Sequence, residues 1–287
     1  MAHVLVLTAA AGRGLADGEI AAVAGATGGG APRRLGRAAA EIALDAPPDL
    51  AALRAAHRGI DLNAVPAQGR RKRLLIADMD STIIPVECID ELADDAGVKA
   101  EVAAITARAM AGELDFAGAL RARLALMQGL SETALARVFA ERIRLNPGAA
   151  TLVRTMAAHG AHTALVSGGF SFFTERVAAA AGFAEHRANR LIFKDGRLAG
   201  VAEPILGREA KLAALGEITA RLGITPAAAI AVGDGANDLA MIEAAGLGVA
   251  YRAQPALEAR ADALIRHADL TALLHLQGYA ESEFRHD

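Results

Sequence analysis

The sequence of 287 residues has little of several things: one cysteine (Cys88), no tryptophan and only 3% aromatic residues. A single cysteine excludes an intramolecular disulfide framework and fits a reducing compartment, so we expect a cytoplasmic protein. The scarcity of aromatic side chains argues against a surface on which nucleic-acid bases could stack. There is also no apolar run of the roughly 20 residues that a membrane-spanning helix needs.

The sequence also has no large excess of either positive or negative charge. Lys and Arg together number 30 against 33 Asp and Glu, a formal net charge of −3. This balance argues against bulk affinity for nucleic acid or an anionic membrane, although a local basic pocket stays compatible with it. The common spacings of zinc sites, serine-hydrolase elbows, phosphate-binding P-loops and dinucleotide-binding turns are all missing.

The first 70 residues predict a small α+β domain. We expect a strand over 3–8, helices over 17–24 and 47–57, and a short apolar element over 60–65, while 35–44 fits either a strand or a helix. No catalytic group of residues occurs in this part. The basic run that ends it, Arg70–Arg73, is better explained as a solvated linker than as a nucleic-acid patch in a chain of net negative charge.

Residues 71–287 have the pattern of an α/β domain. Four short apolar runs are typical of strands buried on both faces of a sheet: 74–77, 163–166, 229–232 and 247–250. Amphipathic helical patterns separate them, which predicts a doubly wound parallel sheet. An insertion over about 87–143 has helical periodicity and predicts a helical cap. Lys194-Asp195-Gly196 predicts the turn of a hairpin within 189–201.

Two acidic motifs follow predicted strands. Asp78-Met79-Asp80-Ser81-Thr82 comes after the first strand, and Gly233-Asp234-Gly235-Ala236-Asn237-Asp238 after the third. Ligands of open parallel sheets bind at the carboxyl ends of strands, and carboxylate and amide oxygens suit Mg²⁺. Taken singly, each motif also fits a solvated loop or a helix cap.

Two smaller signals lie between these motifs. Ser167-Gly168-Gly169 joins a predicted strand to a helix, where a hydroxyl and backbone N–H groups can hold phosphate, although the same residues also make an ordinary turn. Lys211 lies in a helical stretch over 208–222, and by itself it would be interpreted as a surface lysine.

The order of these residues along the chain resembles the four motifs of the haloacid-dehalogenase-like superfamily. The matching residues are Asp78-x-Asp80-x-Thr82, Ser167, Lys211 and Gly233-Asp234-Gly235-x-Asn237-Asp238. Within the superfamily, the sequence from about Leu74 to Ala250 resembles the phosphoserine phosphatases. The further residues that carry this likeness are Glu87 in Glu87-Cys88-Ile89-Asp90-Glu91, Met110-x-Gly112-x-Leu114-x-Phe116, Leu120-Arg121-x-Arg123 and Val166-Ser167-Gly168-Gly169-Phe170.

The resemblance implies a haloacid-dehalogenase-like α/β fold with an inserted helical cap. It also implies hydrolysis of O-phosphoserine, the last step of serine biosynthesis, through an aspartyl-phosphate intermediate. The resemblance fades over 1–70, where family members often carry an ACT-like domain that is regulatory or oligomerising. The implied partner is a small phosphoester, with no nucleic acid or membrane, and a homodimer is compatible.

The resemblance also implies roles for single residues. Asp78 would be the nucleophile and Asp80 the general acid and base. Mg²⁺ would be held by Asp78, Asp234 and the backbone carbonyl of Asp80, with Asp238 contacting the metal ligands or a metal-bound water. The residues that would hold the phosphoryl group are Ser167, Gly168, Lys211 and Asn237.

Substrate choice would belong to the cap. The resemblance implies that Glu87 binds the substrate ammonium, that Arg123 binds its carboxylate, and that Met110 and Phe116 form an apolar lid. Without the resemblance, Glu87 would be a helix N-terminal charge, Arg123 a surface cation, and the two apolar residues part of the packing inside the cap. The rival functions are a phosphatase or phosphotransferase of the same superfamily for another phosphoester, and a non-catalytic amino-acid sensor.

Overall fold

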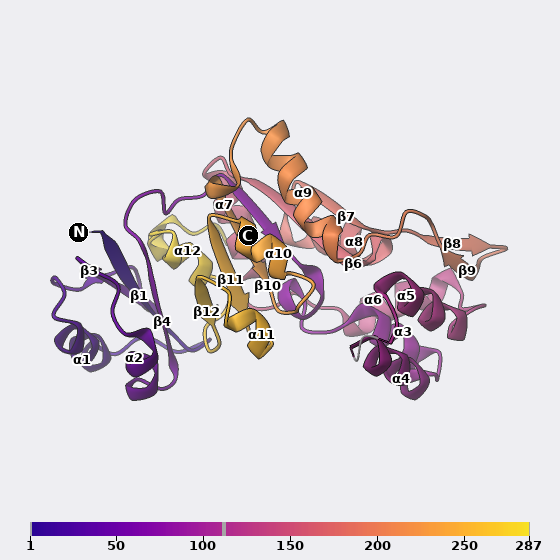
Figure 1. Ribbon diagram of the computed structural model, residues 1–287, viewed down its shortest axis with the longest axis horizontal. Helices are drawn as coiled ribbons and strands as arrows, with labels where there is room; N and C mark the ends of the chain where they lie inside the picture. The colour runs from indigo at the N-terminus through magenta and orange to yellow at the C-terminus, as the bar shows by residue number, and fades with distance from the viewer. Residues whose placement is uncertain (1, 111–112, 287) are drawn as a thin grey trace.

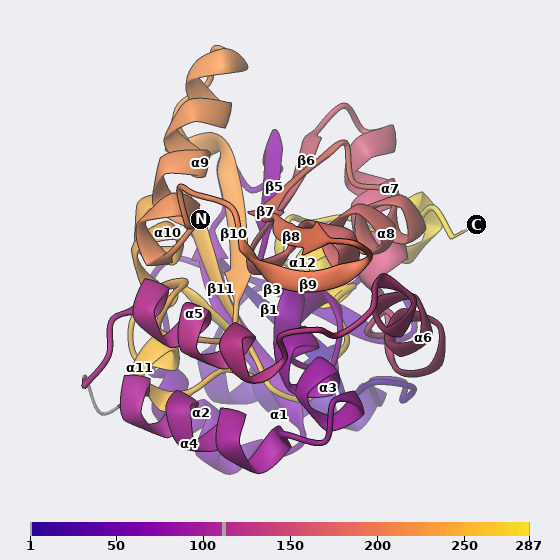
Figure 2. The ribbon, with the colours of Figure 1, turned by 90° about the vertical axis from the view of Figure 1, so that its right-hand side faces the viewer.

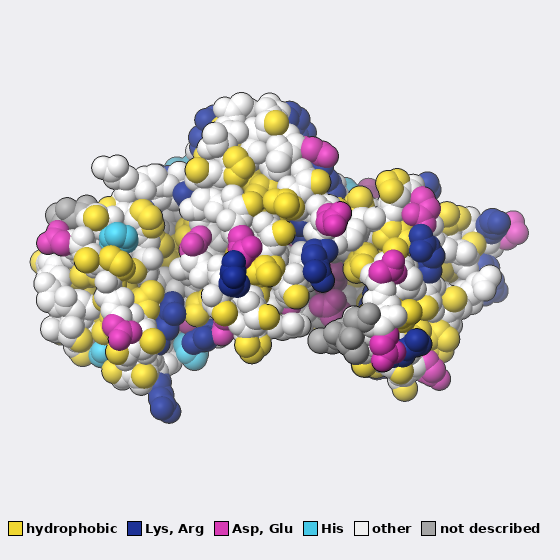
Figure 3. Space-filling model, in the orientation of Figure 1, with side chains coloured by type: hydrophobic (Ala, Val, Ile, Leu, Met, Phe, Trp, Pro, Cys, Tyr) yellow, Lys and Arg dark blue, Asp and Glu magenta, His cyan; other side chains and the backbone are white. Residues whose placement is uncertain are grey.

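The computed structural model describes residues 2–110 and 113–286, apart from the side chain of Met110. Three parts lie in a row (Figure 1): a small N-terminal domain, a central sheet between helices, and a cap of helices with a hairpin. Side chains of both charge signs are interspersed over the face that Figure 3 shows. Among the described helices, none combines the length and the apolar character that a bilayer crossing requires.

The N-terminal domain has the order β-α-β-β-α-β. Its elements are β1 (His3–Ala9), α1 (Asp17–Thr27), β2 (Arg33–Arg34), β3 (Ala39–Leu44), α2 (Leu50–Ala56) and β4 (Ile60–Pro66). The strands form an antiparallel sheet in the order β2-β3-β1-β4, which is the ferredoxin-like topology. The ambiguous segment 35–44 is therefore a strand over its second half.

Two helix boundaries in this domain differ from the prediction. The first helix does not end at residue 24 but continues to Thr27, and the following Gly28, whose φ is +59°, ends it. The second begins three residues later than expected, because the Asp49 side chain accepts the N–H groups of Ala51 and Ala52 and thereby caps the helix.

The central sheet confirms the predicted doubly wound parallel architecture. In the described chain its order is β12-β11-β10-β5-β6-β7, and neighbouring strands are parallel. The strands are β5 (Leu74–Ala77), β6 (His162–Phe170), β7 (Glu185–Asn189), β10 (Ala229–Gly233), β11 (Leu247–Tyr251) and β12 (Ala263–Ile265). The two edge strands were not predicted, since β7 is mostly polar and β12 has only three residues.

Helices cover both faces of this sheet (Figures 1 and 2). Successive side chains of β5 point to opposite faces of the sheet. Leu75 packs into the hydrophobic cluster that contains one set of helices, and Leu74 and Ile76 pack into the cluster that contains the other set. The first set is α7 (Ala149–Ala158), α8 (Ser171–Ala181) and α12 (Ala272–Leu276). The second set is α9 (Arg208–Arg221), α10 (Leu239–Ala244) and α11 (Pro255–Glu258).

The cap contains the predicted helices and also a hairpin. Its helices are α3 (Cys88–Asp95), α4 (Lys99–Met110), α5 (Phe116–Leu126) and α6 (Glu132–Arg142), and its hairpin is β8 (Leu191–Lys194) with β9 (Arg197–Val201). The hairpin turns at Asp195 and Gly196, which both have positive φ, as the sequence predicted. Leu198 joins the hairpin to the cap through hydrogen bonds with Gly129 (2.9 Å) and Leu130 (2.8 Å). A segment far along the chain therefore completes the cap.

Buried polar side chains attach the N-terminal domain to the central sheet beside β12. Asn63, which is 1% exposed, donates to the Leu264 carbonyl at 2.9 Å and accepts the Leu264 N–H at 2.8 Å. Asp61 accepts the backbone N–H groups of residues 266–268 at 2.8 to 3.3 Å. Near the C-terminus, the Glu281 carboxylate accepts two more N–H groups, from Arg37 and Ala38. These bonds join segments some 200 residues apart in the chain.

Candidate active site

The motifs meet at one edge of the central sheet. The strands β10, β5 and β6 are neighbours, so the loops after β10 and β5 and the irregular end of β6 converge at their carboxyl ends. Helix α9 adds Lys211 from one face of the sheet. The structure thus brings together six of the predicted residues: Asp78, Asp80, Ser167, Lys211, Asp234 and Asp238.

Lys211 forms the centre of a buried ionic cluster. Its Nζ lies 2.7 Å from Asp78 Oδ2 and 2.6 Å from Asp238 Oδ1, and the lysine side chain is 2% exposed. Burial by itself lowers the pKa of Lys211, but the charges of the two carboxylates outweigh it and raise that pKa above its usual value. The interpretation of Lys211 as a surface lysine is therefore wrong.

One ammonium group faces two carboxylates in this cluster. Burial, followed by the charge of Asp238, raises the pKa of Asp78 well above its usual value, and Lys211 only partly opposes this. The second oxygen of Asp78 accepts the N–H of Met79 at 2.7 Å. Asp238 is held by the N–H groups of Asp234 and Gly235, at 3.2 and 3.1 Å. Hydrogen bonds therefore hold both carboxylates in place, and the single ammonium group does not neutralise the two of them.

Asp80 lies beside this cluster in a different environment. Its Oδ1 accepts the backbone N–H of Cys88 at 2.9 Å, and its Oδ2 accepts the Ser167 hydroxyl at 3.2 Å. Burial raises the pKa of Asp80, although these hydrogen bonds oppose the shift. A carboxyl group whose protonated form is favoured in this way can donate a proton to a leaving group.

Three carboxylates offer a site for a divalent cation. Oxygen atoms of Asp78, Asp234 and Asp238 all lie within 4.8 Å of one another. Burial and the charge of Asp238 raise the pKa of Asp234 to about 6, and the Thr82 hydroxyl donates to Asp234 at 3.1 Å. Hard oxygen ligands, together with the excess negative charge, fit Mg²⁺. Gly233 allows this arrangement, because a Cβ there would lie 2.3 Å from Asp238 Cγ.

A strained turn connects the carboxylates to the cap. Ser81 has a φ of +55°, which is rare for a residue with a side chain, and its hydroxyl donates to Glu87 at 2.7 Å. Glu87 as a whole is exposed, but its carboxyl group faces this turn. Desolvation there, reinforced by the charge of Asp80, raises the pKa of Glu87 to about 7.

The other predicted cap residues lie on α5 and at the end of α4. The Arg123 guanidinium donates to the Ala119 carbonyl at 3.3 Å, and it makes no ion pair within the described chain. Phe116 is 36% exposed and lies over the Ser167 loop, since a Cβ on Gly168 would be 3.0 Å from its ring. Met110 is the last residue of α4, and its side chain lies outside the described residues.

The sequence interpretation missed one positioning residue. Asn189, at the end of β7, donates to the carbonyl groups of Gly168 (2.8 Å) and Leu206 (3.1 Å), and accepts the Leu206 N–H at 2.7 Å. It thereby holds the Ser167-Gly168-Gly169 turn, which we predicted to bind phosphate, against the segment that leads to α9. No motif marks this residue, because its role depends on an edge strand that the polar sequence concealed. Asn237, by contrast, lies at the predicted loop, next to Gly235.

The family model described as "haloacid dehalogenase-like hydrolase" matches residues 75–243. A phosphoserine phosphatase from Polaromonas sp. strain JS666 is 48% identical over 210 residues, which cover 71% of this chain and 89% of that protein.

Two solved structures extend the comparison. A HAD family hydrolase from Salmonella enterica serovar Typhi has a TM-score of 0.86 at 30% identity, and the match covers 99% of this chain and all of that one. A phospho-aspartyl intermediate analogue of phosphoserine phosphatase has a TM-score of 0.66 at 39% identity, covering 71% of this chain and 98% of that chain. The first similarity includes the N-terminal domain.

Proposed function

Because this chain belongs to the haloacid dehalogenase-like hydrolases and has phosphoserine phosphatases among its relatives, we propose that it hydrolyses O-phosphoserine to serine and phosphate. It is a phosphoric monoester hydrolase that acts through an aspartyl-phosphate intermediate. The observation that carries the proposal is the buried cluster of Asp78, Lys211 and Asp238 beside the hydrogen-bonded carboxyl group of Asp80.

The proposed reaction has two steps, in which the two carboxyl groups of the first motif divide the work. An Asp78 carboxylate oxygen attacks phosphorus while the bond from phosphorus to the serine oxygen breaks, and Asp80 gives its proton to that oxygen. In the second step Asp80 takes a proton from water, whose oxygen attacks phosphorus and releases Asp78. Phosphate monoesters hydrolyse very slowly in water, so the enzyme must lower the activation barrier by about 20 kcal/mol. Division of the reaction into two steps contributes to this.

Other residues hold the phosphoryl group and balance its charge. Lys211 has a third N–H donor beyond the two that contact Asp78 and Asp238, and this donor is available to a phosphoryl oxygen. We propose that the Ser167 hydroxyl and the backbone N–H of Gly168 bind further oxygens, with Asn237 at the opposite loop. The close packing of these groups supports a small and dry site.

The carboxylate cluster supports Mg²⁺ as the cofactor. We propose that Asp78, Asp234 and the Asp80 carbonyl hold the ion, with Asp238 beside them. When bound, Mg²⁺ supplies positive charge that offsets repulsion between the nucleophilic carboxylate and a dianionic phosphate.

Substrate choice is proposed to lie in the cap. Glu87 would bind the ammonium group of serine and Arg123 its carboxylate, while Phe116 and Met110 exclude water. The support for Arg123 is that burial lowers its pKa, which the charges of Asp90 and Glu87 only partly oppose, and that it makes no ion pair within the described chain. A substrate carboxylate would supply that partner.

For residues 1–70 we propose an ACT-like domain with a regulatory or oligomerising role, and the ferredoxin-like topology supports this. Residues 71–287 would form the phosphatase part, with the cap inserted over about 87–143. We also propose a cytoplasmic enzyme, compatible with a homodimer, whose partner is the small phosphoester.

Kinetics with two substrates test the proposal. Phosphoethanolamine lacks the carboxylate of O-phosphoserine but keeps its ammonium and phosphate groups. Arg123→Ala should lower kcat/KM for O-phosphoserine by roughly 100-fold or more and that for phosphoethanolamine much less, because only the first substrate loses a charge-assisted pair.

Arg121→Ala is the matched control, since Arg121 lies on the same helix and pairs with Glu203 at the surface. Equal losses on both substrates would reject Arg123 as the carboxylate partner. A wild-type enzyme that prefers a generic aryl phosphate would reject O-phosphoserine as the substrate.

A further inference from the structure

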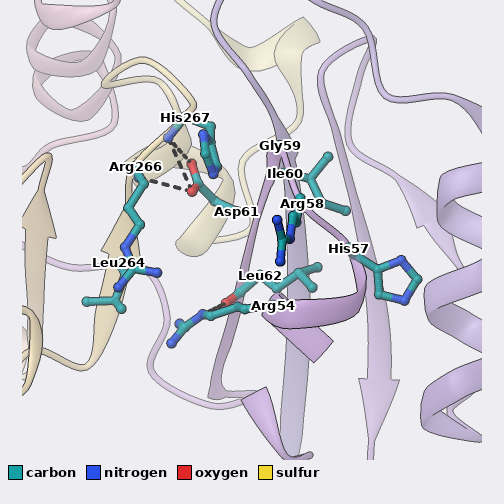
Figure 4. A pocket seen from close by; sticks show the side chains of 10 residues that line it. All are labelled: Arg54, His57, Arg58, Gly59, Ile60, Asp61, Leu62, Leu264, Arg266 and His267. Carbon is teal, nitrogen blue, oxygen red and sulfur yellow. Dashed lines mark hydrogen bonds between the residues drawn. The ribbon is translucent and has the colours of Figure 1, made fainter. Parts of the chain in front are cut away.

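A cavity lies at the joint between the N-terminal domain and the central sheet, away from the carboxylate cluster. Its volume is about 200 Å³, and Figure 4 shows the ten residues that line it. One wall comes from α2 and β4, and the other from β12 and the residues that follow it. In the sheet order, β12 is three strands from β5, so this cavity is separate from the site that holds Asp78.

The lining has more positive charge than negative charge. Arg54 and Arg58 come from the N-terminal domain and Arg266 from the phosphatase side, whereas Asp61 is the one carboxylate among the lining residues. Asp61 is 4% exposed and already accepts the backbone N–H groups of residues 266–268, which compensate its charge. Figure 4 shows the bonds of Asp61 with Arg266 and His267 at one end of the cavity and Arg54 at the other.

Several N–H donors of the three arginines have no hydrogen-bond partner among the described residues. Arg54 donates through Nε to the Leu62 carbonyl and through Nη2 to Asn63, which leaves its Nη1. Arg266 donates through Nε and Nη2 to Glu258, which again leaves Nη1. Arg58 is exposed and makes no side-chain hydrogen bond or ion pair within the described chain.

The cations also repel one another. Burial lowers the pKa of Arg54, and the charge of Arg266 lowers it further, while Asp61 and Glu258 only partly oppose these effects. An anion between the two guanidinium groups would relieve this repulsion and use their free N–H donors.

The remaining lining limits the size and character of the ligand. Ile60, Leu62 and Leu264 are buried and give the cavity an apolar floor. A volume of about 200 Å³ is below the range of about 300–1,000 Å³ typical of drug-sized ligands, so it suits a small molecule. We propose that this cavity binds a small metabolite anion, with a carboxylate or phosphate-type group held between the arginines of the two domains.

Binding measurements on the full-length protein test this site without reference to its activity. Sulfate and malonate serve as probes for the tetrahedral oxyanion and the carboxylate, each titrated at low ionic strength by isothermal calorimetry. Arg58→Ala removes a cation that makes no hydrogen bond or ion pair within the described chain, and Arg266→Gln with Glu258→Gln removes both members of the pair on the other wall. Lys194→Ala, an exposed cation on the distant hairpin, is the matched control for net charge.

We expect the wild type to bind at least one probe with a component that both variants weaken roughly tenfold or more, while Lys194→Ala binds as the wild type does. Binding of either probe at the active site is common to all four proteins and cancels in the comparison. Identical titrations of the wild type and Arg58→Ala with both probes would overturn the proposal. Unchanged binding in the Arg266/Glu258 double variant would overturn the claim that the ligand is held between the domains.

Discussion

Replacing Lys211 with methionine is the most direct test of the electrostatic cluster. Methionine keeps most of the length of the side chain but removes the ammonium group that lies 2.7 Å from Asp78 and 2.6 Å from Asp238. Both carboxylates are less than 7% exposed, so solvent cannot replace the lost charge. Removing one partner of a buried ion pair costs about 3–5 kcal/mol, because it leaves an uncompensated charge.

We therefore expect Lys211→Met to lower the free energy of unfolding by about 3–5 kcal/mol in the absence of divalent cations. The measurement is urea denaturation with EDTA at neutral pH, followed by far-UV circular dichroism because the chain has no tryptophan. Arg121→Met is the control: it breaks an ion pair whose two side chains are more than half exposed, and should change the free energy by about 1 kcal/mol or less.

A double-mutant cycle separates the charge effect from packing. Asp238→Asn removes one of the two carboxylates, so adding it to Lys211→Met should recover part of the lost stability. We expect a coupling energy of about 1–3 kcal/mol. The reasoning is refuted if Lys211→Met unfolds within about 1 kcal/mol of the wild type, or if the two substitutions are simply additive.

Four further predictions concern chemistry, metal, pH and the domain joint. Asp78→Asn should lower kcat by roughly 10⁴-fold or more and leave no acid-trapped phosphoenzyme; wild-type turnover would end the case for this nucleophile. Mg²⁺ should raise the Tm of the wild type but not of Asp234→Asn, and an equal rise in both would place the ion elsewhere. As pH falls through about 7, protonation removes the charge of Glu87. The kcat/KM for O-phosphoserine should then fall relative to that for phosphoglycolate, which lacks the ammonium group. Glu87→Gln should abolish this pH-dependent difference between the two substrates. Asn63→Ala should cost about 2–4 kcal/mol and lower Tm, since it leaves the Leu264 N–H and C=O groups unpaired; an unchanged Tm would contradict this.

The sequence was most informative where strands are buried on both faces. Runs such as Leu74–Ala77 are continuously apolar because helices cover both sides of the sheet, so the strand and the carboxylates after it could be placed together. The parallel order then required the loops after β5 and β10 to meet. The roles assigned to single residues, including Glu87 and Arg123, stay predictions.

What the sequence concealed depends on contacts between distant segments. The sequence of its helix alone predicts that Lys211 is a surface residue. The packing of α9 against the sheet places it between two carboxylates. The β8–β9 hairpin was predicted, but its attachment to the cap depends on bonds with Gly129 and Leu130, some 70 residues earlier. The interdomain cavity is likewise lined by residues that are about 200 positions apart.

The attachment of the N-terminal domain beside β12 has a consequence for how the protein behaves when shortened. β12 is an edge strand, and Asn63 occupies the N–H and C=O of Leu264 that would otherwise face outward. An uncovered edge of this kind recruits strands from other molecules and promotes aggregation. Removing the small domain would therefore expose these two polar groups of Leu264 at the edge of the sheet, and water or another strand would have to replace Asn63 there.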